Sequence, residues 1–88
     1  MGYKIIELTA GQWTGLIDAE DNEVPLKCQN LTSDAVMVIE TDGLEKAREM
    51  NIGFVIPPHH FFETTSLHPV FFKAHRSGKL IYMVDVRA

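Results

Sequence analysis

Cysteine, basic residues and long apolar runs are all scarce in this sequence. The single cysteine, Cys28, cannot form a disulfide within the chain, which fits a reducing compartment. The longest unbroken apolar run, residues 80–84, is far shorter than the ~20 residues that a membrane-spanning helix needs. The N-terminal residues lack the basic region, apolar core and cleavage site of a signal peptide. We therefore expect neither a transmembrane helix nor secretion by that route.

Positive charge is also in short supply. Eight Lys and Arg residues against twelve Asp and Glu residues give a net charge of -4 and an isoelectric point near 5.4. An acidic chain without a basic stripe is repelled by a polyanion. The glycines do not cluster as a phosphate-binding loop requires. These features argue against nucleic acid as a partner.

Short apolar runs, separated by turn-forming residues, dominate the second half of the chain. They lie at residues 53–56, 61–62, 70–72 and 80–84. The runs are too short and too rich in β-branched and aromatic residues for helices, and their spacing is typical of small antiparallel folds. The 88 residues suffice for one domain. The sequence therefore predicts an all-β fold, a small antiparallel β-sandwich or partly open barrel formed by a single domain, residues 1–88.

The first half adds further strands. Residues 3–8 and 24–30 alternate in a way that predicts strands, and residues 12–18 predict a short irregular one. Residues 36–39 follow a polar turn after 24–30, and the pair predicts a hairpin. Residues 1–23 as a whole are expected either to supply peripheral strands or to form an N-terminal arm.

One short helix is predicted, over about residues 43–50. Asp42 and Glu45 have the spacing of a capping box, in which the Asp side chain caps the first turn. A helix of two turns is not stable alone, so its apolar stripe must dock on the sheet.

The last two strands have the signature of a second hairpin. Residues 70–75 and 79–87 flank the turn Arg76-Ser77-Gly78. Glycine at position 78 suits a left-handed residue that closes a type I turn with a bulge. We expect the two strands to pair across it.

The sharpest hint of a ligand is a set of four histidines within seventeen residues. These candidate metal ligands are His59, His60, His68 and His75. Imidazole is a common metal ligand, but His59 and His60 are neighbours on a predicted strand and point to opposite faces. No His-x-His or Cys-x-x-Cys spacing is present. Surface histidines near the turns at 57–60 and 68–75 are the better interpretation, and no cofactor is predicted.

No cluster of residues indicates catalysis. Cys28 shares a strand face with Val24 and Leu26, where a small buried apolar side chain is the usual role. The acidic run 18–23 lacks the spacing of a calcium-binding loop and fits a solvated loop. We predict a protein that is not an enzyme.

Several strands carry apolar side chains on both faces, because neighbouring residues of a strand point in opposite directions. The pairs Phe61-Phe62 and Phe71-Phe72 show this. One small core cannot use both faces, so the helix or a second chain must cover an outer surface. The candidate interface residues are Trp13, Phe62, Phe71, Ile81 and Met83.

The order of these motifs resembles small bacteriophage and prophage proteins encoded among virion-structure genes. The resemblance spans residues 24–86. It is carried by Gln29-Asn30-Leu31-Thr32-Ser33, Val36-Met37-Val38, Gly53-Phe54-Val55-Ile56-Pro57, Pro69-Val70-Phe71-Phe72-Lys73-Ala74 and Gly78-Lys79-Leu80-Ile81-Tyr82. The chain departs from that pattern at residues 57–60, where a glycine is expected after the proline. A type II turn there would force a positive φ on His59.

The resemblance implies a non-enzymatic structural or assembly protein of a phage or prophage particle. Such a protein works by self-association or by attachment to other virion proteins, in the virion or in the bacterial cytoplasm. The alternative is a small bacterial ligand- or metal-binding β-barrel module that uses the histidines. Surplus strand edges in a small domain favour the first interpretation, because association would bury them.

Overall fold

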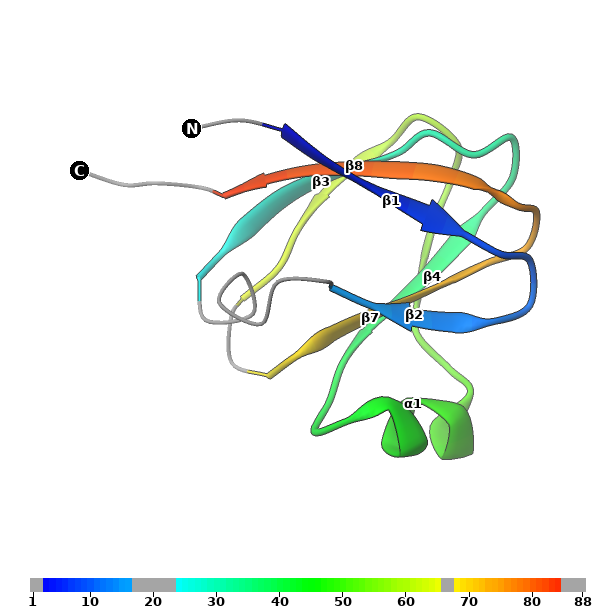
Figure 1. The fold of residues 1–88 in the computed structure, drawn as a ribbon, viewed down its shortest axis with the longest axis vertical. Helices are drawn as coiled ribbons and strands as arrows, with labels where there is room; N and C mark the ends of the chain where they lie inside the picture. The colour runs from blue at the N-terminus through cyan, green and yellow to red at the C-terminus, as the bar shows by residue number, and fades with distance from the viewer. Residues whose placement is uncertain (1–2, 17–23, 66–67, 85–88) are drawn as a thin grey trace.

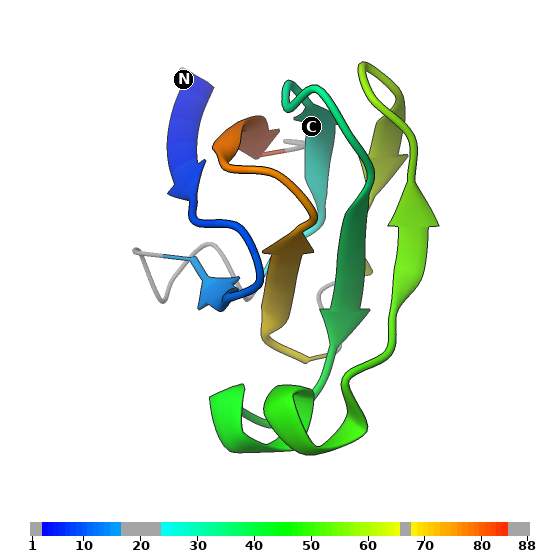
Figure 2. The ribbon, with the colours of Figure 1, turned by 90° about the vertical axis from the view of Figure 1, so that its right-hand side faces the viewer.

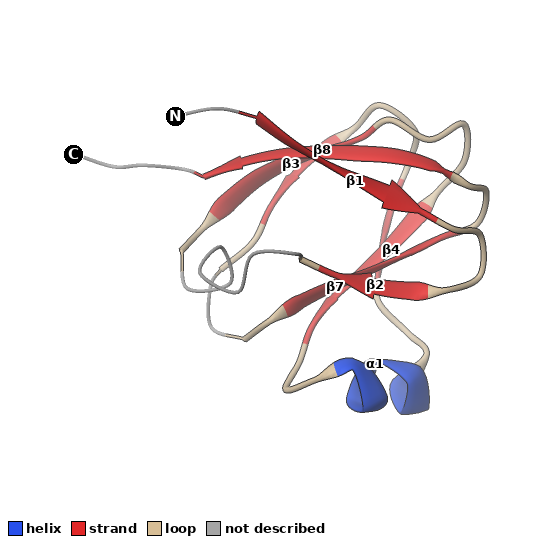
Figure 3. Cartoon of the chain, viewed as in Figure 1, coloured by secondary structure: helices blue, strands red, loops and turns tan. Residues whose placement is uncertain are grey.

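The chain forms two four-stranded antiparallel sheets packed face to face, as the computed structural model shows (Figure 1). The structure describes residues 3–16, 24–65 and 68–84. Within them lie eight strands and one helix (Figure 3). The elements are β1 (Tyr3–Leu8), β2 (Trp13–Gly15), β3 (Leu26–Asn30), β4 (Val36–Glu40), α1 (Leu44–Met50), β5 (Phe54–Ile56), β6 (Phe61–Glu63), β7 (Val70–Ala74) and β8 (Gly78–Val84). The predicted all-β sandwich with one short helix is confirmed.

The strand order is that of a jelly roll. Sheet A has the order β1-β8-β3-β6 and sheet B the order β2-β7-β4-β5. Among the described strands, successive strands alternate between the sheets, except that β4 and β5 belong to the same sheet and are joined through α1. Two Greek keys wound together in this way make the eight-stranded jelly roll. β1 and β2 each occupy a sheet edge, so the described N-terminal residues form peripheral strands.

Both predicted hairpins are wrong. β3 pairs with β6 and β8, whereas β4 belongs to the other sheet. In the same way β7 pairs with β2 and β4, and β8 pairs with β1 and β3. Each of the two turns carries the chain from one sheet across to the other. Residues 17–18 and 85–87 of the predicted strands lie outside the described residues.

Glycine at position 78 has a different purpose from the predicted one. Gly11 is the described glycine with a positive φ, so Gly78 is not left-handed. A Cβ atom at Gly78 would instead lie 2.9 Å from Cγ2 of Thr32. The crossing after β7 therefore needs glycine because another turn packs directly against it.

The core fills the space between the sheets with side chains from alternate strand positions. Phe72, Leu26, Leu80 and Val36 are its largest fully buried apolar side chains. Phe62, one of the candidate interface residues, is half-buried and packs inward on Phe72, with ring centroids 6.1 Å apart. Its place is therefore in the core rather than on an outer face.

A buried amide, Asn30, ties the two sheets together at the end of β3. Its Nδ2 group donates to the carbonyls of Asp34 (2.8 Å) and Ile56 (3.0 Å). Its Oδ1 atom accepts from the amide (2.8 Å) and the hydroxyl (2.7 Å) of Thr32. Asn30 and Thr32 are 0% and 1% exposed. The network joins β3 in sheet A to β5 in sheet B.

The helix α1 packs under sheet B, at the bottom of Figure 2. Its position agrees with the predicted range, but the predicted capping box is wrong. Gly43 is the N-cap, no side chain caps the first turn, and the carboxylate of Asp42 lies 3.4 Å from Nδ1 of His68. Asn51 ends the helix in the left-handed conformation, and its backbone N–H donates to the carbonyl of Ala47.

Candidate interaction site

The helix α1 covers part of the outer face of sheet B. Ala47 of α1 packs on Trp13 and Phe71, and these three residues form a second, small buried cluster. Three partly buried residues surround the cluster: Met37, Ile39 and Leu44. Trp13 and Phe71, predicted as interface candidates, are only 8% and 9% exposed. The helix thus covers the apolar side chains that β2 and β7 present on the outer face of sheet B.

The outer face of sheet A has no such cover among the described residues. The strand register places Tyr3, Met83, Lys27 and Glu63 in one row across the four strands. The next row contains Ile5, Ile81, Gln29 and Phe61. Their neighbours Ile6, Leu80 and Cys28 are buried in the core, so the two rows face outward. We call these eight residues the sheet A face.

Aromatic side chains stand at both edges of the sheet A face. Tyr3 on β1 is 71% exposed and Phe61 on β6 is 76% exposed, whereas Ile81 and Met83 on the central strand β8 are half-buried. Between the edges lies an open hollow of about 400 Å³ with a mainly apolar lining. It is lined by Tyr3, Lys27, Cys28, Gln29, Phe61, Ile81, Tyr82 and Met83. The structure therefore brings Ile81 and Met83 together with two aromatic residues that were not among the candidates.

Charges on and beside the sheet A face cancel. Lys27 lies opposite Glu63 in the register of β3 and β6, and Glu7 lies opposite Lys79 in the register of β1 and β8. Cross-strand pairs of opposite charge are mutually stabilising. The chain as a whole has a net charge of -4, so this face is locally neutral on an acidic molecule.

The edge of sheet B at β5 is a second exposed apolar region. Ile52, Phe54 and Val55 are 61%, 81% and 62% exposed. Phe54 lies in register with buried Val38 but belongs to the edge strand β5 and remains exposed. Unlike the sheet A face, this edge is a strip one strand wide.

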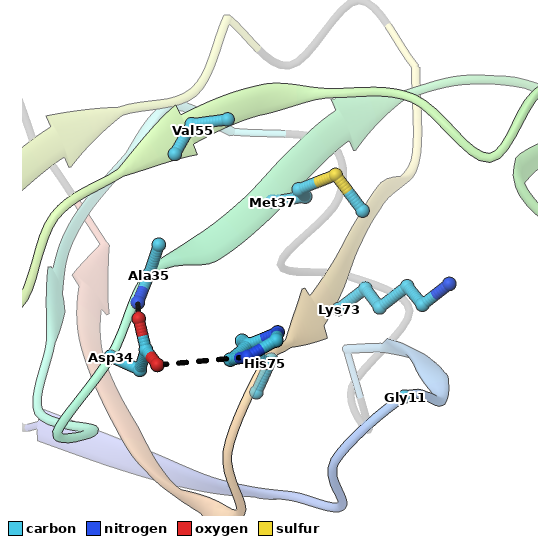
Figure 4. Close-up of a pocket in the computed structure, with 8 residues that line it drawn as sticks. Gly11, Asp34, Ala35, Met37, Val55, Lys73 and His75 are labelled. Carbon is cyan, nitrogen blue, oxygen red and sulfur yellow. Dashed lines mark hydrogen bonds and ion pairs between the residues drawn. The ribbon is translucent and has the colours of Figure 1, made fainter.

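Sheet B also carries a shallow groove on its outer face, lined by residues of β4, β5 and β7 (Figure 4). Its volume is about 450 Å³, and its lining includes Met37, Val55 and Lys73. The Nζ atom of Lys73 donates to Oδ1 of Asn51 at 2.7 Å and lies 5.8 Å from the centre of the Trp13 ring. These contacts fix Lys73 within the chain, and the groove is also lined by Asp34 and His75.

The histidines are spread over the surface. His59 and His60 lie in the turn between β5 and β6, where Nδ1 of His60 is 3.1 Å from the carbonyl of Pro58. His68 faces Asp42, and Nε2 of His75 lies 3.8 Å from Asp34 (Figure 4). Across residues 3–16, 24–65 and 68–84, no three His, Cys, Asp or Glu side chains converge as metal ligands would.

The turn at residues 57–60 has an unusual backbone conformation. His59 has a φ of +65°, in the left-handed region that glycine adopts more readily. Its amide donates to the carbonyl of Asn30 at 2.7 Å, and its carbonyl accepts from Nε2 of Gln29 at 3.0 Å. Hydrogen bonds on both sides of the residue hold this conformation in place.

Cys28 has the properties of a core residue. It is 1% exposed, and burial, helped by the negative charge of Glu40, raises its pKa to about 12. The thiol is therefore protonated near neutral pH and is a poor nucleophile.

Comparisons with protein-family models, curated proteins and solved structures returned no match. None of the described helical residues forms a segment with the length and apolar character to cross a membrane. The properties of the described surface are therefore the basis for a functional assignment.

Proposed function

We propose that this chain is a non-enzymatic structural or assembly protein of a phage or prophage particle, and that it binds its partner through the sheet A face. The observation that carries the proposal is the contrast between the two outer faces. Trp13 and Phe71 of sheet B lie under α1, whereas Tyr3 and Phe61 of sheet A are 71% and 76% exposed. Contiguous apolar surface with a polar rim is typical of protein interaction sites.

The fold and the resemblance to phage proteins support the same proposal. Jelly rolls occur in viral capsid proteins and also in lectins and cupins, so the fold is compatible with a virion protein but does not specify the function. Here the space between the sheets is filled by Phe72, Leu26 and Leu80. The exposed aromatic residues lie on the outside, where they favour contact with another protein surface over enclosure of a small ligand.

The proposal is tested by the composition and binding properties of virus particles. Particles released from a bacterium that carries this gene should contain the chain in a fixed copy number, as measured by quantitative mass spectrometry. Purified chain should bind particles from a strain lacking the gene, and Tyr3→Ser should weaken that binding at least tenfold. Phe54→Ser is the matched control, because it removes an equally exposed aromatic residue outside the sheet A face. Absence of the chain from the particles, or equal effects of the two variants, would contradict the proposal.

A further inference from the structure

We infer that the sheet A face binds a second copy of this chain, forming a dimer in which each copy inserts Phe61 into the hollow of the other. The inference rests on the proposed function, because it assigns a partner to the same face.

The shape of the face suits its own copy. Phe61 projects as an exposed aromatic side chain from β6, and the hollow of about 400 Å³ begins directly beside it. Gln29 on β3 lies between Phe61 on β6 and Ile81 on β8 in the strand register. A twofold axis that passes over β3 therefore places the Phe61 ring of each copy against Ile81 of the other, with the two Phe61 rings on opposite sides of the axis. A projection and a recess of matching chemistry on one face are what an interface between identical surfaces requires.

The charge pattern also favours a second copy. Two chains of net charge -4 repel each other, so they approach best through a neutral surface. The sheet A face is such a surface, because Lys27 opposes Glu63 within it and Glu7 opposes Lys79 at its border. A partner of high charge of either sign would find no complementary field there.

The area of the sheet A face sets the expected affinity of the dimer. An aromatic side chain buries roughly 150–250 Å² when fully covered, so Tyr3 and Phe61 together contribute on the order of 300 Å² per copy. With the half-buried residues of the hollow, the total remains below the ~1,200 Å² that marks the weak end of specific interfaces. We therefore expect a dissociation constant on the order of 10–100 μM, and a dimer that becomes permanent only where many copies are held together.

Sedimentation equilibrium between about 5 μM and 1 mM tests this inference. Wild type and Phe54→Ser should shift from monomer to dimer across this range, and Phe61→Ser should stay monomeric at 1 mM. The side chains of both Phe residues are mostly exposed, so neither variant should affect folding, which circular dichroism verifies. In parallel, the NMR methyl signals of Ile81 and Met83 should shift with concentration in wild type and not in Phe61→Ser. Tyr3→Ser provides a second variant of the same face and should weaken the dimer at least tenfold.

Three outcomes overturn the inference: a wild-type monomer at 1 mM, a dimer unaffected by Phe61→Ser, or equal disruption by Phe54→Ser. Binding to particles separates this result from the proposed function. A strictly monomeric chain that still binds particles through Tyr3 would leave the proposed function standing and replace the second copy by another virion protein.

Discussion

Replacement of Asn30 should show how much stability one buried amide contributes to this sandwich. The side chain makes four hydrogen bonds, to the carbonyls of Asp34 and Ile56 and to the amide and hydroxyl of Thr32. Each bond contributes roughly 0.5–1.5 kcal/mol net, so Asn30→Ala should lower the free energy of unfolding by about 2–6 kcal/mol. A small domain has only ~5–15 kcal/mol in total. The midpoint of thermal unfolding should fall by at least about 8 °C.

Asn30→Asp tests the same network with almost no change in shape. One carboxylate oxygen can still accept from Thr32, but the other would face the carbonyl oxygens of Asp34 and Ile56, which do not donate. Burial and this repulsion raise the pKa of the new carboxyl above the unfolded value of about 3.9. Folding then favours the protonated form, so stability is greatest below about pH 4 and is lost as the pH rises above it.

Urea denaturation of wild type and both variants at pH 4 and pH 7 provides the measurement. Asn30→Asp should be closer to wild type at pH 4 than at pH 7, and Asn30→Ala should show the same deficit at both. Gln29→Ala is the matched control, because that amide makes one hydrogen bond at the exposed turn and should cost less than about 1 kcal/mol. A loss below 1 kcal/mol for Asn30→Ala, or no pH dependence for Asn30→Asp, would refute the role of the network.

Three further predictions concern backbone geometry and burial. Gly53→Ala should destabilise the fold by about 1–3 kcal/mol in urea denaturation, because the new Cβ would lie 2.6 Å from the carbonyl oxygen of Val38; an unchanged midpoint would contradict this contact. His59→Gly should stabilise the fold by about 0.5 kcal/mol because it relieves a positive φ, whereas His60→Gly should destabilise it; calorimetric midpoints that shift in the same direction would refute this assignment. Above about pH 9 the wild type should lose stability relative to Cys28→Ala, since folding keeps the thiol protonated up to a pKa of about 12; a constant difference between pH 8 and 11 in urea would exclude this effect.

Strand positions could be predicted from the sequence because they depend on local composition. The β-branched run in residues 36–39 and the alternation of residues 3–8 mark strands whatever their partners are. Strand pairing could not be predicted in the same way. The turn Arg76-Ser77-Gly78 suits a tight hairpin, yet it carries the chain from β7 in sheet B to β8 in sheet A. Which strands pair depends on which residues far apart in the sequence are buried together. Here β8 pairs with β1 and β3.

The candidate surface was predictable in part for a related reason. Alternation shows that Phe61 and Phe62 face opposite ways, but it does not show which of them meets the core. Phe62, a predicted interface residue, packs on Phe72, whereas Phe61 is 76% exposed. For Trp13 and Phe71, the deciding factor was where α1 docks. Only three-dimensional packing separates the two faces of such strands.

The pairing of β1 with β8 has a consequence for the order of folding during synthesis. Tyr3 lies opposite Met83 and Leu8 opposite Gly78, so β1 cannot pair until β8, far along the sequence, has left the ribosome. Until then β1 has no partner strand, and the apolar side chains of sheet A stay uncovered. Folds dominated by such distant pairings form slowly and expose strand edges on the way. High expression should therefore favour aggregation of nascent chains, and slower translation of β7 and β8 should reduce the soluble yield.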